Sequence, residues 1–275
     1  MSGGSSTPRL EAIDVSYTYA GDTLTKALEG LNLSVPDGAF VAVLGPVGCG
    51  KTTLLRIFAG FLRPTQGTAR CDGSIIDRPS PSRGYVLQEN AIFPWMSVRE
   101  NVEFGLLAKG EDAATRRKVS SELIDLLGLS AFEDAYPKEL SAGMSKMVEV
   151  ARVFATDPSI LLLDEPFGAL DAQTRAELQD ELVRIWQRTQ KTILFITHDI
   201  AEAILLADRI VTMTAGPEAR LKTIAPVTLK RPRDLLDAGA VALYRQLRDD
   251  IGAEVTKSLR DQGLASEAAS GGAAP

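Results

Sequence analysis

The sequence predicts an α/β domain built around a largely parallel sheet, and three observations lead to that class. Short apolar runs alternate with segments of helical periodicity. Three of the runs are continuously apolar, as strands buried on both faces of a parallel sheet are. Each run gives way to polar or glycine residues at its C-terminal end, where open α/β sheets bind ligands. The runs are FVAVLG at 40–45, ILLLDE at 160–165 and ILFITHD at 193–199.

The remaining segments show a different pattern. Residues 91–156 carry helical periodicity without a convincing strand, so we expect a helical subdomain inserted into the sheet domain. The small, polar ends of the chain, residues 1–8 and 263–275, are predicted to be disordered. Near the C-terminus, apolar residues recur every four positions and predict helical packing against the domain; they are Leu243, Leu247, Ile251, Val255 and Leu259.

The composition is that of a soluble globular protein. The 275 residues are 45% hydrophobic, which is enough for a large core, and their net charge of -6 argues against a basic nucleic-acid-binding surface. No apolar run approaches the roughly 18 residues of a membrane span, and the polar start predicts no secretory signal. The two cysteines form no metal-binding or disulfide pattern, so we expect a cytosolic protein.

The segment GPVGCGKTT matches the phosphate-binding pattern G-x-x-x-x-G-K-[ST], and it lies between a predicted strand and a predicted helix. Its glycines let backbone N–H groups turn toward phosphate oxygens, and the helix N-terminus adds a favourable dipole. Lys51 is expected on the β- and γ-phosphates and the Thr52 hydroxyl on Mg²⁺. The predicted ATP-binding residues of this loop are Gly45, Pro46, Val47, Gly48, Cys49, Gly50, Lys51, Thr52 and Thr53.

Cys49 lies inside this loop, close to the start of the predicted helix. A helix N-terminus lowers the pKa of a thiol. We therefore expect alkylation of Cys49 to block nucleotide binding and bound ATP to protect it.

Two carboxylates and the only histidine follow the other two apolar runs. In phosphoryl-transfer sites a strand-end Asp holds Mg²⁺, and the next carboxylate can polarise the attacking water. Asp164 is therefore the predicted metal ligand and Glu165 the predicted base. His198 lies near the end of the third run, where a lone histidine is by itself more often a hydrogen-bonded structural residue than a catalytic one.

With these motifs identified, residues 9–262 resemble the ATP-binding subunits of ATP-binding cassette (ABC) transporters. The family's elements occur in its order: the phosphate loop, LQEN, LSAGM at 140–144, LLLDEP, GALD at 168–171 and ITHD. The resemblance implies a P-loop NTPase (RecA-like) core with a mixed sheet, formed by residues 9–90 and 157–225. It also implies a helical signature subdomain at 91–156 and C-terminal helices at 226–262.

The resemblance also supplies roles at matching positions. Tyr19 is expected to stack on adenine, with Tyr17 as an alternative. Gln88 is expected to contact the metal and the attacking water, and His198 to contact the γ-phosphate. Asp171 looks like the residue that couples two ATP sites across a dimer.

The signature loop departs from the family's usual Leu-Ser-Gly-Gly-Gln, because it reads LSAGM. In the family this loop caps the γ-phosphate bound to the opposite subunit. Ser141 and Gly143 keep a hydroxyl and an unobstructed N–H group. Ala142 would be strained if its position needed a positive φ, and Met144 lacks the usual amide.

The resemblance is greatest to the nitrate, sulfonate and taurine importer branch. It implies an ATPase that uses ATP and Mg²⁺ as a head-to-tail homodimer on the cytoplasmic face of the cell membrane. Integral membrane permease subunits and an extracellular or periplasmic solute-binding protein are the expected partners, with the segment around Phe93, Pro94 and Trp95 near the permease contact. The alternative is a nucleotide-binding regulatory module whose altered signature loop impairs turnover. A nucleic-acid-directed ABC ATPase is disfavoured by the acidic balance.

Overall fold

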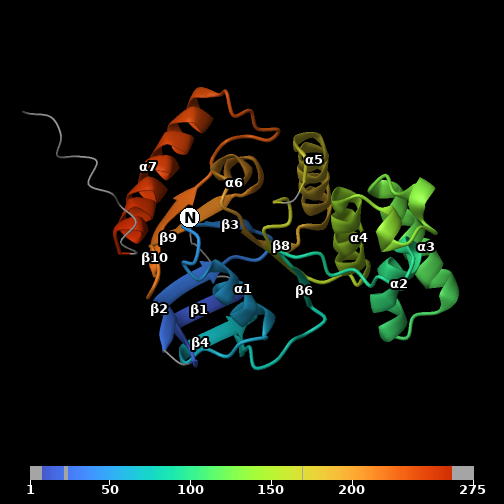
Figure 1. The fold of residues 1–275 in the computed structure, drawn as a ribbon, viewed down its shortest axis with the longest axis horizontal. Coiled ribbons are helices and arrows are strands. Elements are labelled where there is room, and N and C mark those ends of the chain that lie inside the picture. Colours follow the sequence, from blue (N-terminus) through green and yellow to red (C-terminus); the bar gives the residue numbers. More distant parts are fainter. Residues whose placement is uncertain (1–7, 22–23, 169, 262–275) are drawn as a thin grey trace, which may run out of the picture.

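Two sheets form the body of the protein (Figure 1). The computed structural model describes residues 8–21, 24–168 and 170–261. The disorder predicted for 1–8 and 263–275 therefore lies outside the described residues, except at Pro8. The larger sheet has the strand order β10-β9-β3-β8-β7-β6 and the smaller one β2-β1-β4-β5. The strands are β1 (Leu10–Tyr19), β2 (Thr25–Val35), β3 (Phe40–Leu44), β4 (Gln66–Cys71), β5 (Ser74–Ile75), β6 (Arg83–Val86), β7 (Ile160–Asp164), β8 (Thr192–Ile196), β9 (Arg209–Met213) and β10 (Leu221–Pro226).

The larger sheet is mixed, as the resemblance to the ABC family implies. Neighbours from β6 to β9 are parallel, whereas β10 is antiparallel to β9. The three predicted apolar runs are β3, β7 and β8, and every residue of these strands is buried. Because the strands are parallel, their carboxyl ends meet at one edge, where Asp164 lies opposite Ile196. The residues that follow each run are thereby brought together.

The helices cover both faces of this sheet and extend to one side of it (Figure 1). Helix α1 packs between the two sheets, and α5 and α6 contribute apolar side chains to the opposite face of the larger sheet. The helices are α1 (Lys51–Ala59), α2 (Val98–Ala108), α3 (Ala113–Leu126), α4 (Ala142–Ala155), α5 (Ala172–Thr189), α6 (Ile200–Leu206) and α7 (Ala238–Asp261), with 3-10 turns η1 (Ser130–Phe132) and η2 (Pro137–Glu139).

Residues 91–156, which are described throughout, contain helices and no strand. Most of their buried apolar side chains form a cluster of their own, whereas Val150 and Phe154 of α4 belong to a cluster of the larger sheet. In Figure 1, α2, α3 and α4 lie together at one end of the molecule. This arrangement suits the predicted insertion, although the domain boundaries themselves stay predictions.

The C-terminal apolar stripe packs only in part. Within residues 226–261 there is one helix, α7, and its Leu247 is fully buried against α6 and the sheet, with Leu243 and Ile251 packed beside it. Val255 is 38% exposed, so the stripe stops contributing to the core before the helix ends. The side chain of Leu259 lies outside the described residues.

Candidate functional site

The phosphate loop joins β3 to α1, and its turn contains a glycine position at which any side chain would clash with β2. Gly50 has φ +86°, and a Cβ atom there would lie 2.7 Å from Leu28 Cδ2. Lys51 begins α1 and is only 7% exposed. Its ammonium donates to the Gly45 carbonyl at 2.8 Å and to the Pro46 carbonyl at 2.9 Å. The loop therefore folds around the cation that is predicted to meet the phosphates.

A cavity of about 550 Å³ opens over this loop. Its opposite wall comes from the start of β2 and from the turn before β10, through residues that the sequence analysis did not identify: Thr25, Lys26, Ala27, Gly216 and Pro217. The predicted site residues that line it are Tyr19, Val47, Gly48, Cys49, Gly50, Lys51, Thr52, Thr53, Gln88 and Glu165. The structure thus brings together phosphate-loop, strand-end and aromatic candidates from four separate segments.

Asp164 is the last residue of β7 and is 2% exposed. Its two carboxylate oxygens accept hydrogen bonds from the Thr52 hydroxyl at 3.1 Å and from the Tyr85 hydroxyl at 3.0 Å. Burial raises the pKa of Asp164, although both hydrogen bonds oppose that effect. A bound cation would favour the charged form of this carboxylate.

The Tyr85 contact was missed at the sequence level. Tyr85 lies on β6, a short strand in the sequence RGYV that has no continuous apolar run. Burial raises the pKa of its hydroxyl, so Tyr85 stays a neutral donor to Asp164. Its position three residues before Gln88 is the one signal that places it near the same edge.

Glu165 holds an uncommon backbone conformation, with φ +45°. Its N–H group donates to the Ile196 carbonyl at 3.0 Å, which ties the end of β7 to the end of β8. Its side-chain atom Oε2 lies 3.4 Å from Gln88 Nε2 and 3.3 Å from His198 Nδ1. A non-glycine residue in this region costs of order 1–3 kcal/mol and occurs most often at functional sites. Three predicted catalytic residues therefore meet at one carboxylate oxygen.

The donor set at this edge fits a small divalent cation. The Thr52 hydroxyl, the Asp164 carboxylate and the Gln88 amide all offer oxygen atoms, which Mg²⁺ prefers. Within the described part of the chain, no three His, Cys, Asp or Glu side chains gather as a metal-binding group. A small set of protein oxygen donors is compatible with Mg²⁺, which usually takes few protein ligands and fills the remaining positions with phosphate oxygens and water.

The prediction of a reactive Cys49 is wrong. The residue is fully buried, and its Sγ lies 2.7 Å from the place a Cβ on Gly45 would occupy. Burial raises the pKa of the Cys49 thiol, and nearby Lys51 only partly offsets this effect. The side chain packs into the core beneath the loop, so Cys49 presents no reactive thiol to the cavity.

Tyr19 and Tyr17 lie together on β1, with ring centroids 4.8 Å apart. The Tyr19 hydroxyl is 3.0 Å from the Thr53 hydroxyl, and Tyr19 lines the cavity while Tyr17 packs against the core. These contacts favour Tyr19 as the aromatic wall of the site. Its stacking on adenine stays a prediction.

Ser141, Gly143 and Asp171 do not line this cavity. Ser141 caps α4 by accepting the Met144 N–H at 3.2 Å, and Gly143 lies in the first turn of that helix. Asp171 caps α5, and hydrogen bonds from Thr174 lower its pKa. Ala142 does not have a positive φ, so its backbone is not strained in the way that a positive φ would require.

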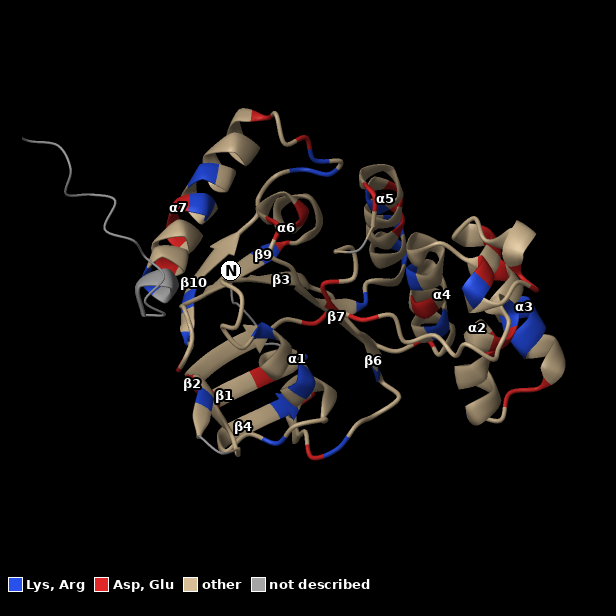
Figure 2. Cartoon of the chain, viewed as in Figure 1, with Lys and Arg blue, Asp and Glu red and all other residues tan. Residues whose placement is uncertain are grey.

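Lys and Arg residues are interspersed with Asp and Glu residues along the helices and loops (Figure 2). No helix of residues 8–21, 24–168 and 170–261 is long and apolar enough to cross a bilayer. Fold and site together define a nucleotide-binding protein with a phosphate loop at the edge of a parallel sheet.

Comparison with known proteins identifies the family. Residues 28–168 match the family model described as ABC transporter, and 3471 curated proteins are significantly similar to the chain. The chain therefore belongs to the ATP-binding proteins of ABC transporters, which are ATPases coupled to transport.

Several relatives bear names of import systems. The nitrate import ATP-binding protein NrtD of Synechococcus elongatus is 42% identical over 82% of this chain and 82% of its own length. The aliphatic sulfonates import ATP-binding protein SsuB of Bacillus thuringiensis is 45% identical over 86% of this chain and 92% of its own length. The expected resemblance to this branch is confirmed.

Solved structures confirm the fold. A dimeric ATP-binding cassette in a post-hydrolysis state, bound to ADP and Pi, is 28% identical, with a TM-score of 0.72 over 80% of this chain and 100% of its own. The protein cbiO1 of Clostridium perfringens, part of the ABC transporter complex cbiONQ, is 28% identical, with a TM-score of 0.73 over 90% of this chain and 97% of its own.

Proposed function

We propose that the chain is the ATP-hydrolysing subunit of an ABC importer. The observation that carries this proposal is the meeting of Gln88, Glu165 and His198 at one carboxylate oxygen beside the phosphate-loop cavity. The import systems named among the relatives support an uptake role. Small anions are the solute class that the nitrate and sulfonate relatives favour.

The phosphate loop is proposed to hold ATP through its backbone N–H groups and Lys51. The Lys51 ammonium now bonds two loop carbonyls, and phosphate oxygens would compete for it as stronger, charged acceptors. Tyr19 forms the wall on which the adenine ring would stack. Thr53 is held by the Tyr19 hydroxyl, which joins the base and phosphate ends of the cavity.

Thr52, Asp164 and Gln88 are the proposed holders of Mg²⁺. The ion supplies neutralisation of phosphate charge and orientation of the transferred group. On the protein side, Tyr85 and Thr52 fix both oxygens of the Asp164 carboxylate. These two hydrogen bonds orient the carboxylate before nucleotide binds, which would reduce the reorganisation that binding requires.

Glu165 is the proposed general base. Its carboxylate would accept a proton from the attacking water while Gln88 and His198 hold Oε2. The hydrogen bond from its N–H group to Ile196 keeps the backbone in the conformation that points the side chain at these partners. His198 would also contact the γ-phosphate.

A second copy of the chain is proposed to complete the site. Ser141, Gly143 and Asp171 lie outside the phosphate-loop cavity, so in a head-to-tail dimer they would meet the nucleotide of the other copy. The helix N-terminus at Ser141 suits a γ-phosphate. The solved cassette with ADP and Pi is itself dimeric.

Separate membrane permease subunits and a solute-binding protein are the proposed partners, with the chain at the cytoplasmic face of the membrane. Trp95 is 69% exposed and its ring stacks on Phe93, with centroids 5.5 Å apart. This aromatic pair lies between Gln88 and α2 in the chain. The pair is suited to a contact with an apolar partner helix. A helix bound there would respond to changes in the position of Gln88.

The second candidate function is a nucleotide-binding regulatory module with impaired turnover. The observation behind it is Met144, which replaces an amide side chain in the signature loop. The assembled cluster at Glu165 argues against it, because a module freed from hydrolysis has no need of that cluster.

The test is Mg²⁺-dependent phosphate release from ATP by the purified chain and by Glu165→Gln. Loss of a general base lowers turnover by about 10²–10⁴-fold, and ATP binding should persist. Absence of turnover in the wild type despite ATP binding would favour the regulatory module or a required membrane partner. Rescue by Met144→Gln with Ala142→Gly would then identify the loop as the cause.

A further inference from the structure

A buried ion pair connects the signature helix to the segment that carries Gln88. Lys146 and Glu149 lie in α4, close to Ser141 at its N-terminus. Their side chains are 5% and 1% exposed, and Lys146 Nζ lies 2.8 Å from Glu149 Oε2. Two charges removed from water to this degree cost free energy, so such a pair is weak evidence for stability.

Both members of the pair bind the backbone next to Gln88. Lys146 Nζ donates to the Leu87 carbonyl at 2.8 Å and to the Gln88 carbonyl at 3.3 Å, while the Glu89 carbonyl lies at 3.5 Å. Glu149 Oε1 accepts the Leu87 N–H at 2.9 Å. One lysine and one glutamate thus bind the donor and acceptors of the same short segment.

This segment has few other supports. Strand β6 ends at Val86, and residues 87–90 belong to neither a helix nor a strand. The side chains at 87–90 are exposed, so packing does not fix them. The backbone of Gln88 is therefore positioned chiefly by α4, while its side chain reaches Glu165 Oε2 at 3.4 Å.

We propose that Lys146 and Glu149 are positioning residues for hydrolysis, which place Gln88 against Glu165 according to the position of the signature helix. This inference rests on the proposed ATPase function. Ser141 and Lys146 share one helix, so a displacement of α4 carries the Gln88 backbone with it. When α4 moves to bring the signature loop onto a phosphate, the same movement places Gln88 against Glu165.

The test variant is the double substitution Lys146→Met with Glu149→Gln. It removes both charges of the pair together, although the nearby half-buried Arg152 loses the carboxylate of Glu149. The new amide oxygen at position 149 can still accept the Leu87 N–H. The carbonyls of Leu87 and Gln88, however, lose their donor. We expect KM for ATP to stay unchanged and kcat to fall by about tenfold to a hundredfold, the size of effect that a misplacement of about 1 Å produces.

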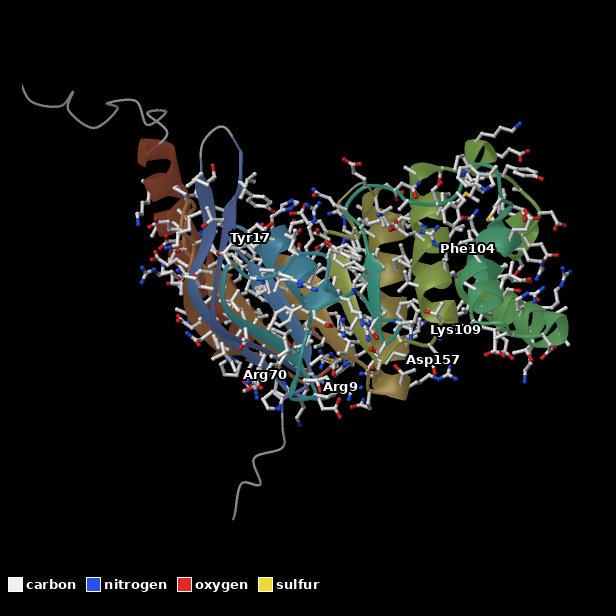
Figure 3. The ribbon with its side chains drawn as sticks, turned by 90° about the horizontal axis from the view of Figure 1, so that it is seen from below. Arg9, Tyr17, Arg70, Phe104, Lys109 and Asp157 are labelled. Carbon is white, nitrogen blue, oxygen red and sulfur yellow. The ribbon has the colours of Figure 1, made fainter. Side chains whose placement is uncertain are left out.

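The matched control is Lys109→Met. Lys109 also donates to a backbone carbonyl at an α4 end, that of Thr156, and it lies close to Asp157 in Figure 3. This contact is at the opposite end of α4 from the signature loop, so kcat should stay at the wild-type value.

A double-mutant cycle with Gln88→Ala decides the proposal. If the ion pair acts through Gln88, the Lys146→Met/Glu149→Gln change will cause little further loss of kcat in the Gln88→Ala background. An equal, independent loss in both backgrounds would overturn the proposal, as would an unchanged kcat. Failure of the ATPase proposal itself is distinct, because the wild type would then release no phosphate.

Discussion

Two regions of this molecule carry the residues predicted to meet phosphate, and the chain assembles them differently. Lys51, Glu165 and His198 follow adjacent parallel strands, and the sheet brings them to one edge. Ser141 and Gly143 lie at the start of α4 in the helical region, outside the cavity that the loop lines. The sheet edge is assembled within a single chain. The start of α4 leaves its groups outside that cavity, where under the proposed function a second copy would use them.

This difference shows that a sheet fixes the relative positions of residues at the ends of its neighbouring strands. Strand register fixes residues at neighbouring strand ends to within a few ångströms, as the pairing of Asp164 with Ile196 illustrates. Helix α4, which carries Ser141, is held by side-chain contacts instead: it packs on the larger sheet through Val150 and Phe154 and bonds the segment after β6 through Lys146. Under the proposed function, chemistry resides at the sheet edge and control resides in the helical subdomain.

The largest effect is expected from breaking the sheet edge at His198. His198→Ala removes a group 3.3 Å from Glu165 Oε2. By analogy with the loss of one preorganised donor, turnover should fall by about 10²–10³-fold while ATP binding persists. Phosphate release and nucleotide binding measure the two effects.

The adjacent control is Asp199→Asn. Asp199 caps α6 by accepting the Ala201 N–H at 2.7 Å, and Asn is an equally good cap. Turnover of this variant should match the wild type. Equal activity of His198→Ala and the wild type would remove His198 from the catalytic group.

A smaller loss is expected from the helical region through Ser141→Asp. Aspartate keeps the cap of α4, so folding is preserved, but its charge repels a phosphate at that helix start. Loss of a hydrogen bond to a charged group, about 1.5–3 kcal/mol, lowers turnover by about 10- to 100-fold. Ser141→Asn, a neutral cap, is the control and should retain more activity. Equal phosphate release by both variants would contradict a phosphate contact here.

The pH dependence of stability sharpens the assignment of Asp164. Because burial raises its pKa above the ordinary 3.8, the folded chain holds this proton more tightly than the unfolded chain does. Its contribution to stability is therefore present at low pH and is lost as pH rises from 3.8 through the folded-state pKa.

Asp164→Asn removes this dependence. Urea unfolding at a series of pH values should show the variant gaining stability relative to the wild type across that window and reaching a constant difference above it. Its Mg²⁺-dependent turnover should be lost. A stability difference that is independent of pH would contradict the assigned environment of Asp164.

The smallest effect concerns Cys49. Its thiol is buried and its pKa is raised, so alkylation near neutral pH should be slow. The half-buried Cys71 provides the comparison and should be labelled first. Mass spectrometry of the alkylated chain measures both rates. Faster labelling of Cys49 would mean that the loop opens more readily than its packing indicates.

The sequence predicted the sheet edge well and the connections between regions poorly. The runs at β3, β7 and β8 are apolar throughout, so the strands and the residues after them were identifiable. Strand β6 is short and mixed, and Tyr85 was missed with it. The Cys49 environment was misjudged because the motif fixes the backbone but not the direction of the side chain. Contacts between distant segments, such as Lys146 with Leu87, have no local signal.

Completion of the site by a second copy is tested most directly by mixing two impaired variants. Lys51→Ala removes the cation of the phosphate loop, and Ser141→Asp weakens the signature loop. In a mixed head-to-tail dimer, one of the two sites combines the intact loop of one copy with the intact Ser141 of the other. Phosphate release from the mixture should therefore rise well above the sum of the separate activities. Release equal to that sum would contradict completion of the site between copies.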